Sequence, residues 1–403
     1  MKGYIKEISG IIPHTYKKVN IQLDGKNLII TGGNASGKTS FLRSAYDKTV
    51  LFIIDKKYEI LPDLKARLLN YENTLSSFEK GSKQYRDYSS YIDNTQKEIE
   101  KIEGGINLHI PKNTTFSAKY DDRTAVIKYF EDSRLADIRE ATMPQGIQTE
   151  IEQNQKATHN HNVGSNLEQH LLNLRIRRST AITEDKDQPL ADSISEWFKE
   201  FEKNLKFLFE YELVELKFDS DRNKFSISQD SKPPYTFQTL SAGYRAIFDI
   251  YSDLLMRTKY FSVTPAELEG VVFIDEIDSH LHVSLQRLIL PFFINSFPKI
   301  QFIVTTHSPF VLMSSRNIIV YDLGKNEQVT VSQVKTQNEI LNDFLSVPVA
   351  MPVWAANSLE EILNNYLSRE PDNISLAALK QELVTAGLET YFPDSVSKIL
   401  ETK

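Results

Sequence analysis

The feature that most constrains the fold of this 403-residue chain is the segment Gly32-Gly-Asn-Ala-Ser-Gly-Lys-Thr39. It matches the pattern G-x4-G-K-[ST], in which glycines let backbone N–H groups surround phosphate oxygens. An apolar run at Lys26–Thr31 precedes it, and an expected helix at Thr39–Lys48 follows it. The sequence therefore predicts an α/β fold with a phosphate group held at the start of a helix.

ATP and Mg²⁺ are the ligands expected at this loop. Lys38 is expected to reach the β- and γ-phosphates, and Thr39 to bind Mg²⁺. The residues expected to bind the nucleotide belong to the loop and the first helical turn: Gly32, Asn34, Ala35, Ser36, Gly37, Lys38, Thr39 and Ser40.

Two other apolar runs end in polar residues. Gly270-Val-Val-Phe-Ile-Asp-Glu276 ends in two carboxylates, which we expect at the edge of the sheet where ligands bind. Asp275 would hold Mg²⁺, and Glu276 would act as the base that polarises the attacking water. Ile303-Val-Thr-Thr-His-Ser-Pro309 ends in His307, which would reach the γ-phosphate if this strand lies beside the Asp275 strand. Together with Lys38, Glu276 and His307 are the expected catalytic residues.

The segment Leu240-Ser-Ala-Gly-Tyr244 begins an expected helix and allows two interpretations. Ser241 is an ordinary N-cap with Gly243 tolerated in the first turn. Alternatively, the N–H groups at this helix end hold an anion. The segment alone does not decide between them.

Composition and charge exclude several classes of protein. The chain has no cysteine, which excludes disulfide frameworks and cysteine-type zinc sites. No signal peptide or membrane span is recognisable, so we expect a soluble cytoplasmic protein. The net charge of −7 disfavours general attraction to nucleic acid, and the basic cluster Arg175-Ile-Arg-Arg178 is interpreted as a solvated helix face. Four histidines are interpreted as structural rather than metal ligands: His159, His161, His280 and His282.

Apolar residues between Leu64 and Ile102 recur mostly in steps of three and four, the narrow stripe of a coiled coil. The break at Lys80-Gly-Ser82 favours an antiparallel helical hairpin over one long rod. We expect strands across Asn113–Asp132 and a polar, mobile stretch at Glu140–Gly164.

The order of these segments resembles the SMC, RecF and OLD branch of ABC-type ATPases over roughly residues 1–320. Leu240–Tyr244 is similar to the Leu-Ser-Gly-Gly-Gln signature of that family, with departures at Ala242 and Tyr244. The resemblance implies that Ser241 and Gly243 contact ATP held by a second subunit, so that a homodimer or higher homo-oligomer forms through ATP. It also places Asp278 at the family's D-loop.

The Q-loop glutamine of the family is not identified in this chain. Gln145 is one candidate, and the segment Tyr129–Arg134 is another region of interest. The resemblance implies an ABC-type core at 1–60, 107–139 and 213–330. It is interrupted by a helical hairpin at 61–106 and by a mobile loop with a helical subdomain at 140–212, and a helical tail follows at 331–403.

The runs Asp275–His282 and Thr305–Phe310 are similar to stand-alone ATPases of bacterial anti-phage systems, such as the Septu and retron-associated ATPases. This resemblance implies an ATPase that controls an effector, which we expect to be a nuclease. The tail after His307 lacks an obvious cluster of acidic metal ligands, so we expect the nuclease to be a separate protein. The tail from Gln337, with Trp354, is either a docking element or part of the core packing. The alternatives are a RecF-like DNA repair ATPase that clamps DNA and, less well matched, a transporter subunit.

Overall fold

The computed structural model describes residues 3–141, 143–154, 156–230, 232–315 and 317–330, together with 358, 361–362, 381–383 and 385–386. The chain divides into two compact units, Met1–Lys335 and Thr336–Lys403. Nearly all of the expected helical tail (331–403), including Trp354, lies outside the described residues. The first unit holds every segment discussed below.

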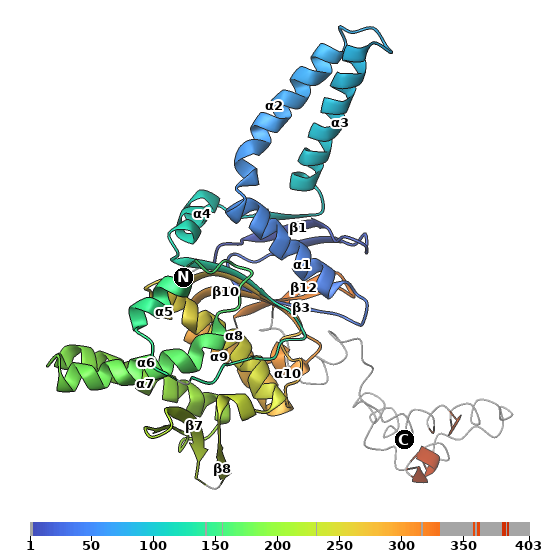
Figure 1. Ribbon diagram of the computed structural model, residues 1–403. Helices are drawn as coiled ribbons and strands as arrows, with labels where there is room; N and C mark the ends of the chain where they lie inside the picture. The colour runs from blue at the N-terminus through green and yellow to red at the C-terminus, as the bar shows by residue number, and fades with distance from the viewer. Residues whose placement is uncertain are drawn as a thin grey trace. The chain divides into compact units, whose positions relative to one another are not determined.

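A six-stranded sheet forms the centre of this unit (Figure 1). Its strands lie in the order β12 (Glu327–Thr330), β11 (Ile318–Asp322), β3 (Asn27–Thr31), β10 (Lys299–Thr305), β9 (Glu269–Ile274) and β5 (Ala125–Phe130). All neighbours are parallel except the β11–β12 pair. The apolar runs of β9 and β10 suit strands that are buried on both faces. The α/β class predicted from the sequence is confirmed.

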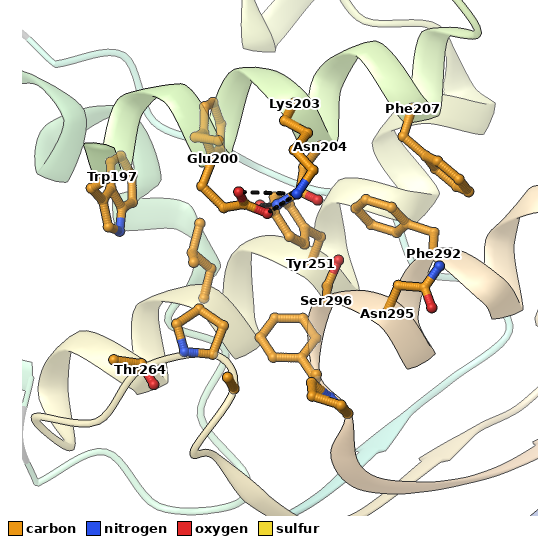
Figure 2. Close-up of a pocket in the computed structure, with 16 residues that line it drawn as sticks. Trp197, Glu200, Lys203, Asn204, Phe207, Tyr251, Thr264, Phe292, Asn295 and Ser296 are labelled. Carbon is orange, nitrogen blue, oxygen red and sulfur yellow. Dashed lines mark hydrogen bonds and ion pairs between the residues drawn. The ribbon is translucent and has the colours of Figure 1, made fainter. Parts of the chain in front are cut away.

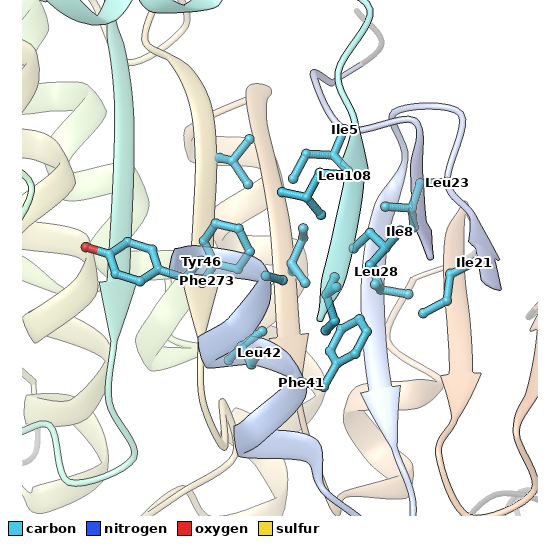
Figure 3. Close-up of a cluster of buried hydrophobic side chains, with 14 of the residues drawn as sticks. Ile5, Ile8, Ile21, Leu23, Leu28, Phe41, Leu42, Tyr46, Leu108 and Phe273 are labelled. Carbon is cyan, nitrogen blue, oxygen red and sulfur yellow. The ribbon is translucent and has the colours of Figure 1, made fainter. Parts of the chain in front are cut away.

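The main core lies between this sheet, helix α1 (Lys38–Thr49) and a second, antiparallel sheet. The second sheet has the order β2 (Lys18–Gln22), β1 (Glu7–Ile11) and β4 (Ile106–His109). Figure 3 shows side chains from α1 and from both sheets gathered in this core. Phe41 and Leu42 lie two and three residues after Thr39, the last residue of the glycine-rich loop. Both side chains are fully buried in this core. The loop is therefore anchored by the helix that it precedes.

A helical hairpin interrupts the core, as the sequence predicted. A π-helical turn at Val50–Ile54 leads into α2 (Lys57–Leu75), and α3 (Lys83–Glu103) returns antiparallel to it (Figure 1). Ser82 begins α3 by accepting a hydrogen bond from the backbone N–H of Tyr85 (3.1 Å). Leu64, Ile99 and Ile102 form the apolar contact at the base of the hairpin.

Most of the remaining helices lie on the other side of the central sheet, whereas the helix at Asn113–Asp121 packs against the π-helical turn on the α1 side (Figure 1). The helices are α4 (Asn113–Asp121), α5 (Ile147–Asn154), α6 (Leu167–Thr183), α7 (Gln188–Phe209), α8 (Ala242–Tyr260), α9 (Val283–Ser296) and α10 (Pro309–Leu312), with short 3-10 turns at Gly164–Asn166 and Phe237–Thr239. A third sheet has the order β6 (Glu215–Asp219), β7 (Lys224–Gln229) and β8 (Lys232–Tyr235). Among the described residues, no helix is long and apolar enough to cross a membrane.

The strands expected across Asn113–Asp132 are confirmed in part. Ala125–Phe130 is strand β5, but Asn113–Asp121 is helix α4, because Phe116 is buried in the core and Ser117 Oγ donates to the carbonyl of Ile53 (2.7 Å). The stretch at Glu140–Gly164, for which no helix was predicted, contains helix α5. In both segments tertiary packing overrides local sequence preference.

Helix α5 is held by a buried carboxylate. Glu150 accepts a hydrogen bond from the side-chain amide of Asn173 (2.7 Å) and lies 3.1 Å from Nδ1 of His170. All three side chains are buried. Because a buried carboxylate needs partners of this kind, the polar sequence around Glu150 supports an ordered element.

Candidate nucleotide-binding site

The loop between β3 and α1 has the backbone that a phosphate-binding loop requires. Gly32 (φ 136°) and Gly37 (φ 98°) adopt left-handed conformations that favour glycine, and Ala35 also has a positive φ (57°). A Cβ on Gly32 would lie 2.9 Å from Ser36 Oγ, so a larger residue would crowd the loop. Asn34 and Ala35 are exposed at the top of the loop.

The amino end of α1 has no side-chain cap. Gly37 occupies the N-cap position, and no side-chain hydrogen bond closes this end of the helix. The first backbone N–H groups of a helix have no partner within it, so Lys38, Thr39 and Ser40 present donors at this end. The helix dipole and these backbone N–H donors together favour the binding of an anion at the amino end of α1.

Lys38 is held above the loop by two carbonyl groups. Its Nζ donates to the backbone oxygens of Gly32 and Gly33, both at 3.1 Å. Burial lowers the pKa of Lys38, whereas the carboxylates of Glu276 and Asp275 raise it. The lysine thus lies within electrostatic reach of both acidic residues that end β9.

Thr305 holds the two acidic residues in place. Its hydroxyl donates to Asp275 Oδ1 (2.5 Å) and accepts from the backbone N–H of Glu276 (2.7 Å). Tyr129 donates to the other carboxylate oxygen of Asp275 (3.4 Å). Glu276 has a positive φ of 43°, a conformation that is rare outside glycine and often found at functional sites. Its carboxylate has no hydrogen bond or ion pair with the described residues.

Arg134 reinforces this turn from the opposite side. Its guanidinium donates to the carbonyl of Asp275 (2.6 Å) and to the carbonyl of Glu276 (2.9 Å). Arg134 is 6% exposed. From the sequence, Tyr129–Arg134 was only a region of interest. In the structure, both ends of this segment contact the Asp275–Glu276 turn. No local pattern marked Arg134, because its partners are backbone atoms 141 and 142 residues away.

His307 follows strand β10 by two residues, and β10 pairs with β9, the strand that precedes Asp275. Burial lowers the pKa of the His307 imidazole, and Lys38 lowers it further, whereas Asp278, Glu276 and Asp275 raise it. Burial and Lys38 therefore favour the neutral imidazole, which forms no hydrogen bond with the described residues. The strand order places β10 between β3 and β9, which brings the loop, both carboxylates and His307 to one sheet edge.

Asp278, the expected D-loop residue, is tied to the His307 segment. It accepts a hydrogen bond from the hydroxyl of Thr306, and Thr306 Oγ1 also accepts from the backbone N–H of Ser308 (2.9 Å). No role was predicted for Thr305 or Thr306 from the sequence. Two consecutive threonines at the end of an apolar strand were the available signal.

Ser241 occupies the N-cap position of α8, but its side chain makes no capping bond. The residue is exposed, and so is Ala242. Gly243 is buried, and a Cβ there would lie 3.1 Å from the carbonyl of His280. The start of α8 therefore packs closely on the segment after Asp278 and leaves the Ser241 hydroxyl free. Ordinary capping by Ser241 is not what the structure shows.

The residues present fit a magnesium-bound nucleotide. Ser36 Oγ and Thr31 Oγ1 are buried in the loop region without a hydrogen-bond partner. The hydroxyl of Thr39 is exposed on the first turn of α1, and Asp275 supplies a carboxylate. Hydroxyl and carboxylate oxygens are the ligands that Mg²⁺ prefers. Thr39 and Asp275 are thus the candidate metal ligands.

Other residues named from the sequence lie elsewhere. Gln145 is exposed, and its backbone N–H donates to Asn173 (2.8 Å), so nothing places its side chain at the loop. The basic cluster is engaged within the fold: Arg177 pairs with Asp185, and Arg178 donates to Ser195 Oγ (2.6 Å).

Three of the four histidines named from the sequence make hydrogen-bond contacts with nearby residues of the fold. His159 Nδ1 lies 3.2 Å from the Tyr120 hydroxyl, and His161 Nδ1 lies 2.9 Å from Thr158 Oγ1. His282 caps α9, and His280 has a positive φ of 65°.

Residues 28–314 match the family described as "AAA domain, putative AbiEii toxin, Type IV TA system". The chain belongs to this family. The match includes the loop, both carboxylates, Ser241 and His307, so the site described above lies within the family domain.

Several curated proteins are similar to parts of this AAA-domain chain. The retron Ec83 probable ATPase of Escherichia coli is 45% identical over 91 residues, which cover 21% of this chain and 17% of that protein. The retron Vc95 probable ATPase of Vibrio cholerae is 36% identical over 158 residues, covering 37% and 28%. The Septu protein PtuA of Bacillus mycoides is 40% identical over 95 residues, covering 23% and 13%. Each match spans less than a third of the relative's length.

Solved structures similar to this AAA-domain chain include heads of SMC proteins. The SMC head bound to the C-terminal winged-helix domain of ScpA aligns with a TM-score of 0.36 and 14% identity, over 82% of this chain and 99% of that one. The SMC head domain from Thermotoga maritima aligns with a TM-score of 0.36 and 11% identity, over 83% and 100%.

Proposed function

We propose that this protein binds ATP with Mg²⁺ and hydrolyses it at the edge of the central sheet. The observation that carries the proposal is the convergence of Lys38, Asp275, Glu276 and His307 there. The carboxylate of Glu276 and the imidazole of His307 both lack partners among the described residues. Membership of the AAA-domain family supports the same conclusion.

The chemistry follows from the positions of these groups. Lys38 exchanges its two carbonyl contacts for phosphate oxygens and stabilises their charge. Glu276 accepts the proton of the attacking water, and Thr305 with Arg134 fixes its backbone so that the carboxylate is oriented. Neutral His307 donates a hydrogen bond to the developing negative charge. Mg²⁺, held by Thr39 and Asp275, would neutralise phosphate charge when bound.

Two variants test this assignment. Lys38→Ala should lose nucleotide binding at least tenfold, because it removes the cation that contacts the phosphates. Glu276→Gln should bind ATP within about threefold of the wild type but hydrolyse it at least 100-fold more slowly. Binding is measured with a fluorescent ATP analogue, and turnover by phosphate release. Normal turnover by Glu276→Gln would show that another group is the base.

We further propose that two copies associate around ATP. The free hydroxyl of Ser241 and the open amino end of α8 form an anion-binding surface that makes no contact with the chain's own loop among the described hydrogen bonds. Because Gly243 has no side chain, the segment after Asp278 packs closely against the start of α8. A nucleotide held by a partner would then bind next to the expected D-loop. ATP would then form part of the interface between the copies.

We also propose that the assembly controls a separate effector, a nuclease, in bacterial anti-phage defence. The retron and Septu relatives support this role. The test is a pull-down of tagged Glu276→Gln protein from its host with ATP, with and without nuclease treatment. A stoichiometric protein partner that remains after nuclease treatment supports the proposal. Recovery of DNA without any protein partner contradicts it and supports a DNA-clamping ATPase.

A further inference from the structure

A cavity of about 560 Å³ lies away from the nucleotide site, between α7, α9 and the segment that follows α8 (Figure 2). This volume falls within the range of about 300 to 1,000 Å³ that is typical of small-molecule sites. Its walls are mainly aromatic: Trp197, Phe201, Phe207, Tyr251, Phe292 and Phe297. None of the residues proposed for nucleotide binding lines it.

Two hydrogen-bond donors in the cavity wall lack partners. Ser296 Oγ is buried and has no hydrogen-bond partner. Figure 2 shows Ser296 next to Tyr251 at the centre of the cavity. The indole N–H of Trp197 makes no hydrogen bond to the described residues either. Other polar groups of the wall have partners: Asn204 donates to the Tyr251 hydroxyl (3.1 Å), and Lys203 pairs with Glu200 (3.0 Å).

A cation lies beside the aromatic wall. Lys259 follows the cavity residue Leu255 by one turn of α8, and its Nζ lies 5.2 Å from the centre of the Trp197 ring. Burial lowers the pKa of Lys259 to about 8. No carboxylate of the described residues forms an ion pair with it. Lys259 is partly buried and does not itself line the cavity. A desolvated ammonium without a counter-ion is unfavourable, and an anionic ligand beside Trp197 would stabilise it.

We propose that this cavity binds a small planar aromatic molecule that carries one anionic acceptor group, such as a carboxylate or a sulfonate. The aromatic walls bury the ring system. Ser296 and Trp197 donate hydrogen bonds to the acceptor group, and Lys259 balances its charge. This proposal does not depend on ATP hydrolysis by the chain.

The cavity has a direct structural connection to the nucleotide site. It contacts the carboxyl-terminal halves of α8 and α9. The amino end of α8 carries Ser241, and α9 begins shortly after Asp278. A ligand in the cavity therefore contacts the two helices whose amino ends lie beside Ser241 and the segment after Asp278, the surface proposed to meet a second copy.

The test uses two fluorescent probes that differ in charge. 8-Anilinonaphthalene-1-sulfonate is an aromatic anion, and N-phenyl-1-naphthylamine is its neutral counterpart. With the full chain we expect saturable binding of the anionic probe with one site per chain. Ala266→Trp fills the exposed rim of the cavity and should weaken this binding at least tenfold. Ala66→Trp, at an exposed position on the hairpin, should change it less than twofold.

A second variant separates charge from burial. Lys259→Met keeps the length of the side chain and should weaken the anionic probe about tenfold while changing the neutral probe less than twofold. Asn295→Trp, at the opposite exposed rim, replaces Ala266→Trp if that variant does not show a cooperative thermal transition. The proposal is overturned by non-saturable binding, by full binding to both rim variants, or by equal responses of the two probes to Lys259→Met.

Discussion

Arg134 fixes the two residues on which the proposed chemistry depends through their backbone oxygens. A planar guanidinium donates to both carbonyls at once, at 2.6 Å and 2.9 Å, and a lysine ammonium lacks this fork. Arg134 touches no proposed reacting atom, so it is a positioning residue. We therefore expect a substitution of Arg134 to change the turnover rate and not the affinity for nucleotide.

We predict that Arg134→Met lowers kcat at least tenfold and changes nucleotide affinity less than threefold, because the carboxylate of Glu276 loses its fixed orientation. Arg134→Lys should restore part of the rate. Arg139→Met, an exposed position on the same segment, is the control and should behave as the wild type. A rise in KM with unchanged kcat in Arg134→Met would contradict the positioning role. The measurement is steady-state phosphate release over a range of ATP concentrations.

Lys259 is predicted to lower the stability of the fold. Burial lowers its pKa from 10.5 to about 8, so the folded chain must hold an unfavourable ammonium below pH 8. Between about pH 8 and 10.5 the folded state releases the proton that the unfolded state retains, and stability rises with pH. We predict that Lys259→Met increases the free energy of unfolding at pH 7 by about 1 to 3 kcal/mol.

The gain from Lys259→Met should shrink at pH 9.5. Both free energies are measured by denaturant unfolding of the full chain. Lys199→Met removes an exposed ion-paired lysine and should change stability by less than about 1 kcal/mol at either pH. A loss of stability in Lys259→Met at pH 7 would contradict the predicted penalty.

At the scale of elements, α1 connects the phosphate-binding loop to the helical hairpin. Lys38 opens this helix, and Lys48 lies near its end with 6% exposure. Lys48 Nζ donates to the carbonyls of Ile102 (2.7 Å) and Gly104 (2.8 Å), where α3 terminates. A cation at the carboxyl end of a helix satisfies carbonyls that have no helical partner.

We predict that Lys48→Met destabilises the base of the hairpin by about 1 to 3 kcal/mol, because the buried carbonyl of Ile102 and the partly buried carbonyl of Gly104 lose their donor. Hydrogen exchange should accelerate in the last turn of α3 more than at the hairpin tip. Lys101→Met, exposed in the same turn, is the matched control and should leave exchange unchanged. Uniform acceleration along α3 in Lys48→Met would mean that Lys48 does not act locally.

At the scale of the whole molecule, the central sheet assembles the site, and the proposed dimer completes it. The loop, Asp275–Glu276 and His307 come from strands β3, β9 and β10, which are adjacent in the order β3, β10, β9. Ser241 is the N-cap residue of a different helix, α8, and its side chain is exposed. This arrangement leaves one surface for the chain's own nucleotide and a second for that of a partner.

We predict that Ser241→Arg abolishes ATP-dependent dimerisation while leaving nucleotide binding within about threefold. The large side chain would block the amino end of α8. Sedimentation in the Glu276→Gln background, with and without ATP, measures the association. Ser193→Arg, an exposed position on α7, is the control and should dimerise normally. If Ser241→Arg still forms the ATP-dependent dimer, the nucleotide is not shared between two copies.

The sequence by itself determined the elements whose signal is local. The glycine-rich loop between an apolar run and a helix, the apolar strands ending at Asp275 and Thr305, and the hairpin broken near Gly81 all depend on periodicity and turn chemistry within short windows. These patterns were sufficient to name the residues that the structure brings to one sheet edge.

Only the tertiary structure decided the features that depend on distant partners. Arg134 acquires its role from carbonyls far along the chain, and Asn113–Asp121 becomes a helix because Phe116 packs into the core. The aromatic cavity is assembled from α7, α8 and α9, and Lys259 is perturbed because these helices bury it. Burial and long-range hydrogen bonds are properties of the packed chain, so no local pattern of residues specifies them.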